Sequence, residues 1–353
     1  MIVEAPVRPG PPFTELPDLA AERVGGATLA CSDDFFASMV NLLKGARAVF
    51  DPHAYTDRGK LMDGWESRRS FGRVEGHTHD WCLIKLGMPG MLRGVDIDTS
   101  FFRGNYPEAA AIDGCEVDGD PDAKALLDPS IAWTEVLPRT ELAGDNSNFA
   151  PFAVTDRRFT HLRLRMFPDG GIARLRVYGA VVPDWARLLA RSATVDLAAV
   201  EHGGQVVAAN DMFFGSRHNL IMPGRSVNMG DGWETRRKRR EGHDWTIVKL
   251  GRRGTVRSIE VDTNHFKGNF PESCWLEGVD APDGADPTEL HADSWFPLLP
   301  RTKLRAHTRH FFTGAANGVA GELTNGARGC THVRLSIHPD GGISRLRVHG
   351  APV

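Results

Sequence analysis

The sequence predicts an all-β protein that consists of two tandem β-sandwich domains related by internal duplication. The segment 63–69, DGWESRR, returns almost unchanged at 231–237 as DGWETRR, and the segments downstream of both copies recur in the same order. Short runs of alternating apolar and polar residues are separated by frequent glycines and prolines, and long stretches with a 3.6-residue apolar period are almost absent. Together these observations are typical of antiparallel β-sandwiches.

The duplication sets the expected domain boundaries. A chain of 353 residues exceeds a comfortable single core, and a repeat of this length is too long for one turn of a solenoid. We therefore expect a short extended N-terminal arm at 1–15, a first repeat at 16–181, a linker at 182–193 and a second repeat at 194–353. The first repeat carries extra residues at 50–61, which we interpret as a loop because a proline and a glycine bound it.

The pattern also predicts particular elements within each repeat. The segments 95–98 (VDID) and 259–262 (IEVD) place aliphatic residues on one face and carboxylates on the other, as half-buried strands do. A β-hairpin is predicted for 162–177, where two alternating strands flank Pro-Asp-Gly-Gly, and again for 333–348. Apolar residues at helical spacing after Pro183 predict a short linker helix.

Composition excludes several classes of partner. The formal net charge of −3 gives no field that would attract nucleic acid or an anionic membrane, and no segment approaches the roughly 18 apolar residues of a membrane span. The five cysteines are odd in number and lack C-x-x-C spacing, so we interpret them as reduced thiols and expect a cytoplasmic protein. Two-sheet domains with arginine-rich, partly apolar edges often associate, so we also expect a homo-oligomer.

Four segments that recur in both repeats carry a resemblance to a known family. They are DGWE[ST]RR, DW-x-[IL]-[IV]-KLG, DT-x-x-F-[RK]-GN-[YF]-PE and [FH]-PDGG-I-[AS]-RLRV-x-G. In this order, and over nearly the full chain, they resemble the allantoicases, the allantoate amidinohydrolases of purine degradation. The resemblance implies two tandem jelly-roll, galactose-binding-like β-sandwiches. It also implies hydrolysis of allantoate to ureidoglycolate and urea in allantoin degradation.

Two other functions stay open on the sequence. Galactose-binding-like sandwiches commonly bind without catalysing, so a non-catalytic tandem carbohydrate-binding module is the main alternative. A metal-dependent amidohydrolase is the other, because His77, His79 and Asp80 have a spacing that suits a divalent ion. The second repeat has only His243 and Asp244 there, and further ligands are not evident, so we assign no metal. We expect no cofactor to be required, with a divalent ion left open.

The implied substrate defines what a site must contain. Allantoate carries one carboxylate and two ureido groups on a single sp³ carbon, and the bond that breaks joins this carbon to a ureido nitrogen. The site therefore needs a cation for the carboxylate, polar groups for the ureas, a general acid for the departing nitrogen and a base for water. An oxyanion hole is not required because no acyl carbonyl is attacked.

The DT-x-x-F-[RK]-GN segment is the first candidate site, because it brings together an acid, a cation and an amide. The residues that it offers are, for catalysis, Asp98, Asp262 and His265, and, for substrate binding, Arg103, Asn105, Lys267 and Asn269. His265 corresponds to Phe101 in the first repeat, so only the second copy has a side chain that titrates near neutrality. This asymmetry favours the second repeat. The alternative is that these residues only shape a turn.

The DGWE segment is the second candidate site. Glu66 and Glu234 are candidate bases, with Glu234 expected in catalysis and Glu66 in substrate binding. Arg68 and Arg236 could clamp the substrate carboxylate. The alternative is a buried tryptophan with an ion-paired glutamate, next to arginines on a solvated strand edge.

Overall fold

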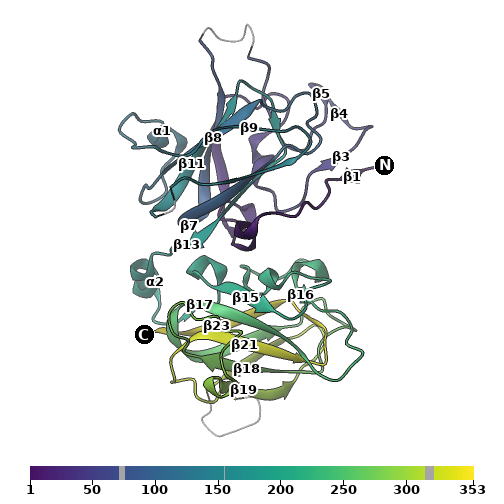
Figure 1. Ribbon diagram of the computed structural model, residues 1–353, viewed down its shortest axis with the longest axis vertical. Coiled ribbons are helices and arrows are strands. Elements are labelled where there is room, and N and C mark those ends of the chain that lie inside the picture. Colours follow the sequence, from purple (N-terminus) through teal and green to yellow (C-terminus); the bar gives the residue numbers. More distant parts are fainter. Residues whose placement is uncertain (71–75, 155, 315–321) are drawn as a thin grey trace. The chain divides into compact units, whose positions relative to one another are not determined.

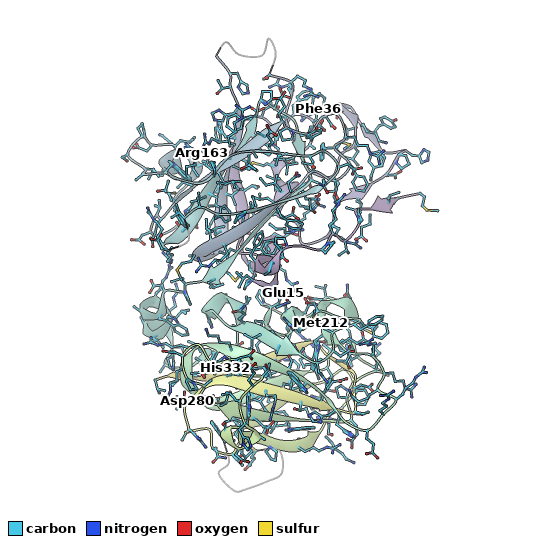
Figure 2. All side chains as sticks on the ribbon, viewed as in Figure 1. Glu15, Phe36, Arg163, Met212, Asp280 and His332 are labelled. Atoms are coloured by element: carbon cyan, nitrogen blue, oxygen red, sulfur yellow. The ribbon has the colours of Figure 1, made fainter. Side chains whose placement is uncertain are left out.

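The computed structural model describes residues 1–70, 76–154, 156–314 and 322–353 (Figure 1). The chain divides into two compact units, Met1–Val182 and Pro183–Val353, and each unit contains one repeat. Side chains fill the interior of both units (Figure 2). Both units consist mainly of β-strands, which confirms the prediction of two all-β domains.

In the first unit, one short helix and thirteen strands alternate with 3₁₀ turns within the described residues. The strands are β1 (Val3–Glu4), β2 (Ala27–Cys31), β3 (Val49–Phe50), β4 (Tyr55–Thr56), β5 (Gly59–Lys60), β6 (Trp65–Glu66), β7 (Asp80–Asp98), β8 (Ala109–Cys115), β9 (Thr134–Glu141), β10 (Ser147–Pro151), β11 (Arg158–Phe167), β12 (Gly171–Ile172) and β13 (Arg174–Val181). The helix is α1 (Ala123–Leu126), and the 3₁₀ turns are Pro12–Glu15, Glu22–Val24 and Met39–Leu43.

Within its described residues, the second unit repeats the order of β2 and β6–β13 as β15–β23. Its strands are β14 (Val195–Asp196), β15 (Gln205–Ala209), β16 (Trp233–Glu234), β17 (Asp244–Asp262), β18 (Ser273–Val279), β19 (Phe296–Lys303), β20 (Arg309–Thr313), β21 (Cys330–His338), β22 (Gly342–Ile343) and β23 (Arg345–Pro352). The helix α2 (Trp185–Arg191) precedes them, and the 3₁₀ turns are Val200–His202, Arg217–Ile221, Met229–Asp231 and Ala292–Ser294. None of the helices in the described part of the chain has the length and apolar character that crossing a bilayer requires.

The 19-residue strand β7 takes part in both sheets of the first sandwich. Its first half, around Leu83, is flanked by β2 and β11, and β11 continues through β8 to β9. Its second half, around Val95, is flanked instead by β10 and β13. Strand β17 does the same in the second unit, between β15 and β21 and then between β20 and β23.

The core of each unit consists of apolar side chains on these long strands and their partners. Buried side chains at equivalent positions are Ile84, Val95, Leu162, Leu164, Leu175 and Val177 in the first unit and Val248, Ile259, Val333, Leu335, Leu346 and Val348 in the second. Each such side chain contributes about 1.5–3 kcal/mol when it leaves water. The alternation read from the sequence therefore marks the strands that hold the sheets together.

The predicted hairpins at 162–177 and 333–348 are wrong. Strands β11 and β13 do form at these positions, but they do not pair with each other. Strand β11 pairs with the first half of β7, and β13 pairs with its second half. The Pro-Asp-Gly-Gly segment between them leads into β12, which pairs with β6. Alternation identifies a half-buried strand but not its partner, and here one long strand is the partner of both.

Three other predicted segments have clear structures. In the N-terminal arm, β1 pairs with β3, and the buried Ala5 donates its backbone N–H to the Ala48 carbonyl. The extra residues at 50–61 form a small β4–β5 hairpin. The linker helix is present as α2, and the side chain of Asp184 caps its N-terminus by accepting from the Arg187 N–H.

Candidate functional site

The structure brings the two candidate motifs of each repeat together. In the first repeat, the Nδ2 of Asn105 donates a hydrogen bond of 2.7 Å to the Oε1 of Glu66. In the second repeat, Asn269 donates to Glu234 in the same way. The amide of each GN loop thus holds the carboxylate of each DGWE segment, and no other pair of predicted site residues recurs in this manner in the described chain.

Backbone hydrogen bonds fix the position of each glutamate. Strand β16 pairs with β22, and the Glu234 N–H and carbonyl also bond to the backbone of Gly215. The Asn269 carbonyl accepts from the N–H of Gly342 at 2.9 Å, so the asparagine is held by its main chain as well. A Cβ on Gly342 would lie 1.9 Å from the ring of Phe266, so this close approach requires glycine. The carboxylate is therefore presented from rigid structure.

The Glu234 pocket has a volume of about 710 Å³. Its charged and amide side chains are Glu234, Arg237, Lys238, Asn269, Glu272, Lys303 and Asp340. Lys238 is already committed, since its Nζ lies 2.7 Å from the buried carboxylate of Asp244. Arg237 and Lys303 are the other cations on the lining, and the ring of Phe214 adds an apolar wall.

The Glu66 pocket is smaller, about 380 Å³, and more apolar. Its aromatic lining residues are Phe36 (labelled in Figure 2), Phe50 and Phe101. Burial raises the pKa of Glu66, against the hydrogen bond from Asn105 and the charge of Arg69, which lower it. A carboxyl group with a raised pKa can hold a proton nearer to neutral pH, which suits general acid catalysis.

The extra loop of the first repeat supplies two of the cations around the Glu66 pocket. Arg58 donates to the carbonyl of Phe35 at 2.8 Å, and Lys60 donates to the carbonyl of Asp51 at 2.7 Å. The second repeat lacks this loop, so the two pockets differ in their surroundings although they share the glutamate and the asparagine.

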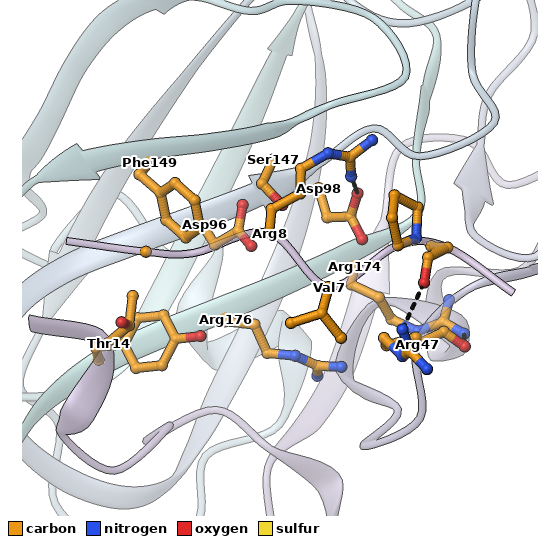
Figure 3. Close-up of a pocket in the computed structure, with 14 residues that line it drawn as sticks. Val7, Arg8, Thr14, Arg47, Asp96, Asp98, Ser147, Phe149, Arg174 and Arg176 are labelled. Carbon is orange, nitrogen blue, oxygen red and sulfur yellow. Dashed lines mark hydrogen bonds and ion pairs between the residues drawn. The ribbon is translucent and has the colours of Figure 1, made fainter.

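Asp98 and Asp262 lie apart from these pockets and form turns. The Oδ1 of Asp98 accepts from the Ser100 N–H at 2.8 Å, and that of Asp262 accepts from the Asn264 N–H at 2.9 Å. Asp98 lines a separate cavity together with Asp96 (Figure 3). The DT-x-x-F-[RK]-GN segment is thus divided: its aspartate caps a turn, as the alternative interpretation expected, and its asparagine lines the glutamate pocket.

Of three further predicted residues, two lie outside the linings of the Glu66 and Glu234 pockets, and the third borders the Glu66 pocket while bonded to another side chain. The Nε2 of His265 lies 2.9 Å from the Ser226 carbonyl, and its backbone N–H bonds to His307. Lys267 is exposed and is absent from the lining of the Glu234 pocket. Arg103 borders the Glu66 pocket, but its Nε bonds to Asp145 at 3.0 Å. The geometry therefore gives no preference to the second repeat through His265.

Arg68 and Arg236 clamp carboxylates of the protein itself. Arg68 donates two hydrogen bonds to the Oδ2 of Asp33, from Nε at 2.8 Å and from Nη2 at 2.6 Å. Arg236 bonds to Asp211 at 2.7 Å. Each pair also fixes the loop that binds the tryptophan of its DGWE segment. In the first repeat, Trp65 donates its Nε1–H to the backbone carbonyl of Asp33, the residue that Arg68 binds. Trp65 and Trp233 are both fully buried, as the structural interpretation predicted.

The sequence analysis missed a buried ion pair that both repeats contain. Arg174 and Arg345, of the RLRV segments, bond to Asp63 and Asp231 of the DGWE segments at 2.7 and 2.8 Å. Both partners recur in the two repeats, so their recurrence was the available signal. The interpretation of the first-repeat histidines as metal ligands gains no support, since His79 bonds to Thr78 and the described residues contain no three-ligand group.

Comparison with known proteins places both repeats in one family. The family model described as the allantoicase repeat matches residues 17–182 and 195–353. The chain is 46% identical to the allantoicase of Dictyostelium discoideum, over 95% of this chain and 87% of that protein. It is 47% identical to a probable allantoicase of Pseudomonas aeruginosa, over 97% of each chain. The crystal structure of allantoicase from Saccharomyces cerevisiae superimposes with a TM-score of 0.74 at 34% identity, covering 95% of this chain and 93% of that one.

Proposed function

The chain belongs to the allantoicase family, and from this premise we propose that its two Glu–Asn pockets are where allantoate is bound and cleaved. The protein hydrolyses allantoate to ureidoglycolate and urea, a step of purine degradation. The observation that supports the location is that Glu66–Asn105 and Glu234–Asn269 are the pair of polar residues that both repeats keep facing a pocket.

The pocket of the second repeat contains the groups that this reaction needs. Arg237 and Lys303 supply cations for the substrate carboxylate. The amide of Asn269 and the carboxylate of Glu234 supply acceptors and donors for the ureido groups. We assign the carboxylate contact to Arg237 and Lys303 rather than to Lys267, because Lys267 is not part of the lining.

The glutamate can act first as base and then as acid. As a carboxylate, Glu234 takes a proton from water while the water oxygen bonds to the central carbon of allantoate. As the C–O bond forms, the bond between this carbon and one ureido nitrogen breaks, and the protonated Glu234 returns the proton to that nitrogen. Urea leaves, ureidoglycolate remains, and the glutamate is a carboxylate again. Glu66 can perform the same steps in the first repeat, where its raised pKa favours the protonated half of the cycle.

A direct assay tests this function. Purified protein is expected to release urea from allantoate and to leave intact allantoin unopened. Dependence on a metal is tested in the same assay by adding a chelator, since the amidohydrolase alternative requires loss of activity. Binding of a carbohydrate without any urea release, at several pH values and with divalent ions added, would instead favour the non-catalytic module.

We also propose a homo-oligomer in a reducing, cytoplasmic compartment. Large apolar side chains of the second repeat are exposed outside the Glu234 pocket, namely Met212, Phe213, Val227 and Met229. Association with another copy would cover such residues. The five cysteines are free thiols, which a reducing compartment preserves. Light scattering at working concentration tests the assembly, and a monomer would contradict it.

A further inference from the structure

The two repeats treat one equivalent carboxylate differently. It stands two residues before the aspartate of the DT motif, as Asp96 in β7 and as Glu260 in β17. In the second repeat, Arg309 on β20 donates two hydrogen bonds to Glu260, from Nε at 2.6 Å and from Nη2 at 2.9 Å. In the first repeat, the position of Arg309 is taken by Ser147, because Arg309 is opposite Asp262 and Ser147 is opposite Asp98. Asp96 therefore has no guanidinium in this place.

Asp96 is buried without the compensation that Glu260 has. Its residue is 8% exposed, and its Oδ1 has no hydrogen-bond partner among the described residues. Burial, and then the charge of Asp98, raise the pKa of Asp96 to about 7, although Ser147, Arg176 and the Asn148 N–H act to lower it. A buried carboxylate oxygen that lacks a donor costs free energy, so a ligand that supplies donors would bind favourably.

Asp96 faces a cavity of about 180 Å³ (Figure 3). The N-terminal arm forms one wall, and Arg8 of the arm donates to the Ser100 hydroxyl at 3.0 Å and to the Asp145 carbonyl at 2.7 Å. This cavity shares no lining residue with the Glu66 pocket. It is therefore a site distinct from the pocket to which we assign the reaction.

The charges of the cavity indicate the class of ligand. Four arginines line it together with Asp96 and Asp98. Arg47 is ion-paired with Glu4 and Arg174 with Asp63, so the cations left for a ligand are Arg8 and Arg176, whose Nη1 lies 3.7 Å from Asp18. A cationic ligand would meet these guanidinium groups, whereas a ureido group offers the same planar pair of N–H donors without a charge. A carboxylate on the same ligand would interact favourably with the arginines.

We propose that this cavity binds a small ureido acid. The N–H groups of the ligand donate hydrogen bonds to Asp96, as the guanidinium of Arg309 donates to Glu260 in the second repeat. The carboxylate of the ligand faces Arg8 and Arg176. Allantoate and ureidoglycolate are both ureido acids, and naming them as natural ligands rests on the proposed function. The ligand class itself rests on the comparison of the two repeats.

Calorimetry on the full chain tests the site with N-carbamoylglycine, a ureido acid that lacks the second ureido group of allantoate. Ser147→Arg copies the second repeat and should abolish binding at this site. Asp96→Asn should weaken it by about tenfold or more. Thermal unfolding of both variants shows whether they are folded. If the Ser147→Arg protein is not folded, the Asp96→Asn protein alone tests the site. The Glu66→Gln/Glu234→Gln protein should retain the site.

Several outcomes would overturn the proposal. They are unchanged binding in folded Ser147→Arg and Asp96→Asn proteins, loss of binding in the Glu66→Gln/Glu234→Gln protein, and tighter binding of methylguanidinium than of the ureido acid. Displacement of the probe by allantoate or by ureidoglycolate in the Glu66→Gln/Glu234→Gln protein would support it and identify the natural ligand. Failure of the proposed function would be recognised by a different result, because the Glu66→Gln/Glu234→Gln protein would then still release urea.

Discussion

Asp63 and Arg174 form a buried ion pair in which Nη2 and Oδ2 are 2.7 Å apart, although 111 residues separate them in the sequence. The guanidinium also donates to the carbonyls of Ala46 and Asp63, and it is 2% exposed. Burial alone would raise the pKa of Asp63, but the bonds from Arg174 and the Val49 N–H hold it below its usual value. This pair ties the DGWE segment to β13.

Replacing Asp63 by alanine should destabilise the first unit by about 3–5 kcal/mol, because it leaves the Arg174 charge buried and unpaired. Urea denaturation at neutral pH measures the change. Since the folded pKa of Asp63 is lowered, its contribution is present above pH 4 and is lost as the pH falls through the folded value. Arg68→Ala, at a pair whose arginine is half exposed, is the control and should cost less than about 1 kcal/mol.

The strands of this fold could be predicted from the sequence, but their pairing could not. Alternation at Leu162 and Leu164 and at Leu175 and Val177 identifies two half-buried strands. It does not reveal that both pair with β7, because the choice of partner depends on a strand long enough to enter two sheets. The linker helix after Asp184 could be predicted because its N-terminal cap and its apolar spacing are local signals in the sequence.

Replacing Glu234 or Glu66 by glutamine should reveal which repeat is catalytic. Loss of the general acid–base group should lower kcat by about 10²–10⁴-fold in the repeat that works, with the fold intact because glutamine keeps the hydrogen bond to asparagine. Steady-state urea release measures this. Glu272→Gln, at the rim of the Glu234 pocket, is the matched control. Full activity in the Glu66→Gln/Glu234→Gln protein would exclude both glutamates from the chemistry.

The candidate site could be predicted in part. Glu66, Glu234, Asn105 and Asn269 were accessible because they stand in recurring motifs, and the structure pairs them. The role of Arg236 could not be predicted. A sequence does not show that its guanidinium is already bonded to Asp211, 25 residues earlier. Polar residues on one loop can face different cavities, and only the backbone path decides which.

Arg237→Met should raise KM for allantoate and lower kcat/KM, because it removes a charged contact to the substrate carboxylate. The loss of transition-state stabilisation should be about 1.5–3 kcal/mol. Lys267→Met is the matched control, since the exposed Lys267 lies outside the lining. If Lys267→Met impairs the enzyme and Arg237→Met is silent, the expectation from the GN loop is right and our assignment of the cation is wrong. In the first repeat, Arg103→Met tests the equivalent loop cation, which does border the Glu66 pocket.

Asn105→Leu should shift the pH dependence of the first pocket, measured in the Glu234→Gln protein. Burial raises the pKa of Glu66, and the hydrogen bond from Asn105 lowers it. Without this bond the pKa rises further, so the acidic limb of the kcat/KM profile should move to higher pH. An unshifted profile with lower activity would mean that Asn105 contacts substrate and does not tune Glu66.

Asp96→Asn should stabilise the protein, and the gain should grow with pH. The folded pKa of Asp96 is raised to about 7 from the ordinary 3.8, so ionisation opposes folding. Below pH 4 the group is protonated in both states and the penalty is absent; it increases as the pH rises and is complete above pH 7. The gain at pH 8 is on the order of 4 kcal/mol at most, by the free energy of such a pKa difference. Thermal unfolding at pH 4 and pH 8 measures it.

The matched control is Glu260→Gln, which should destabilise the protein at pH 8 because Glu260 is ion-paired with Arg309. If Asp96→Asn also destabilises at pH 8, the Asp96 carboxylate is compensated within the fold, and the difference between the repeats carries no energetic consequence.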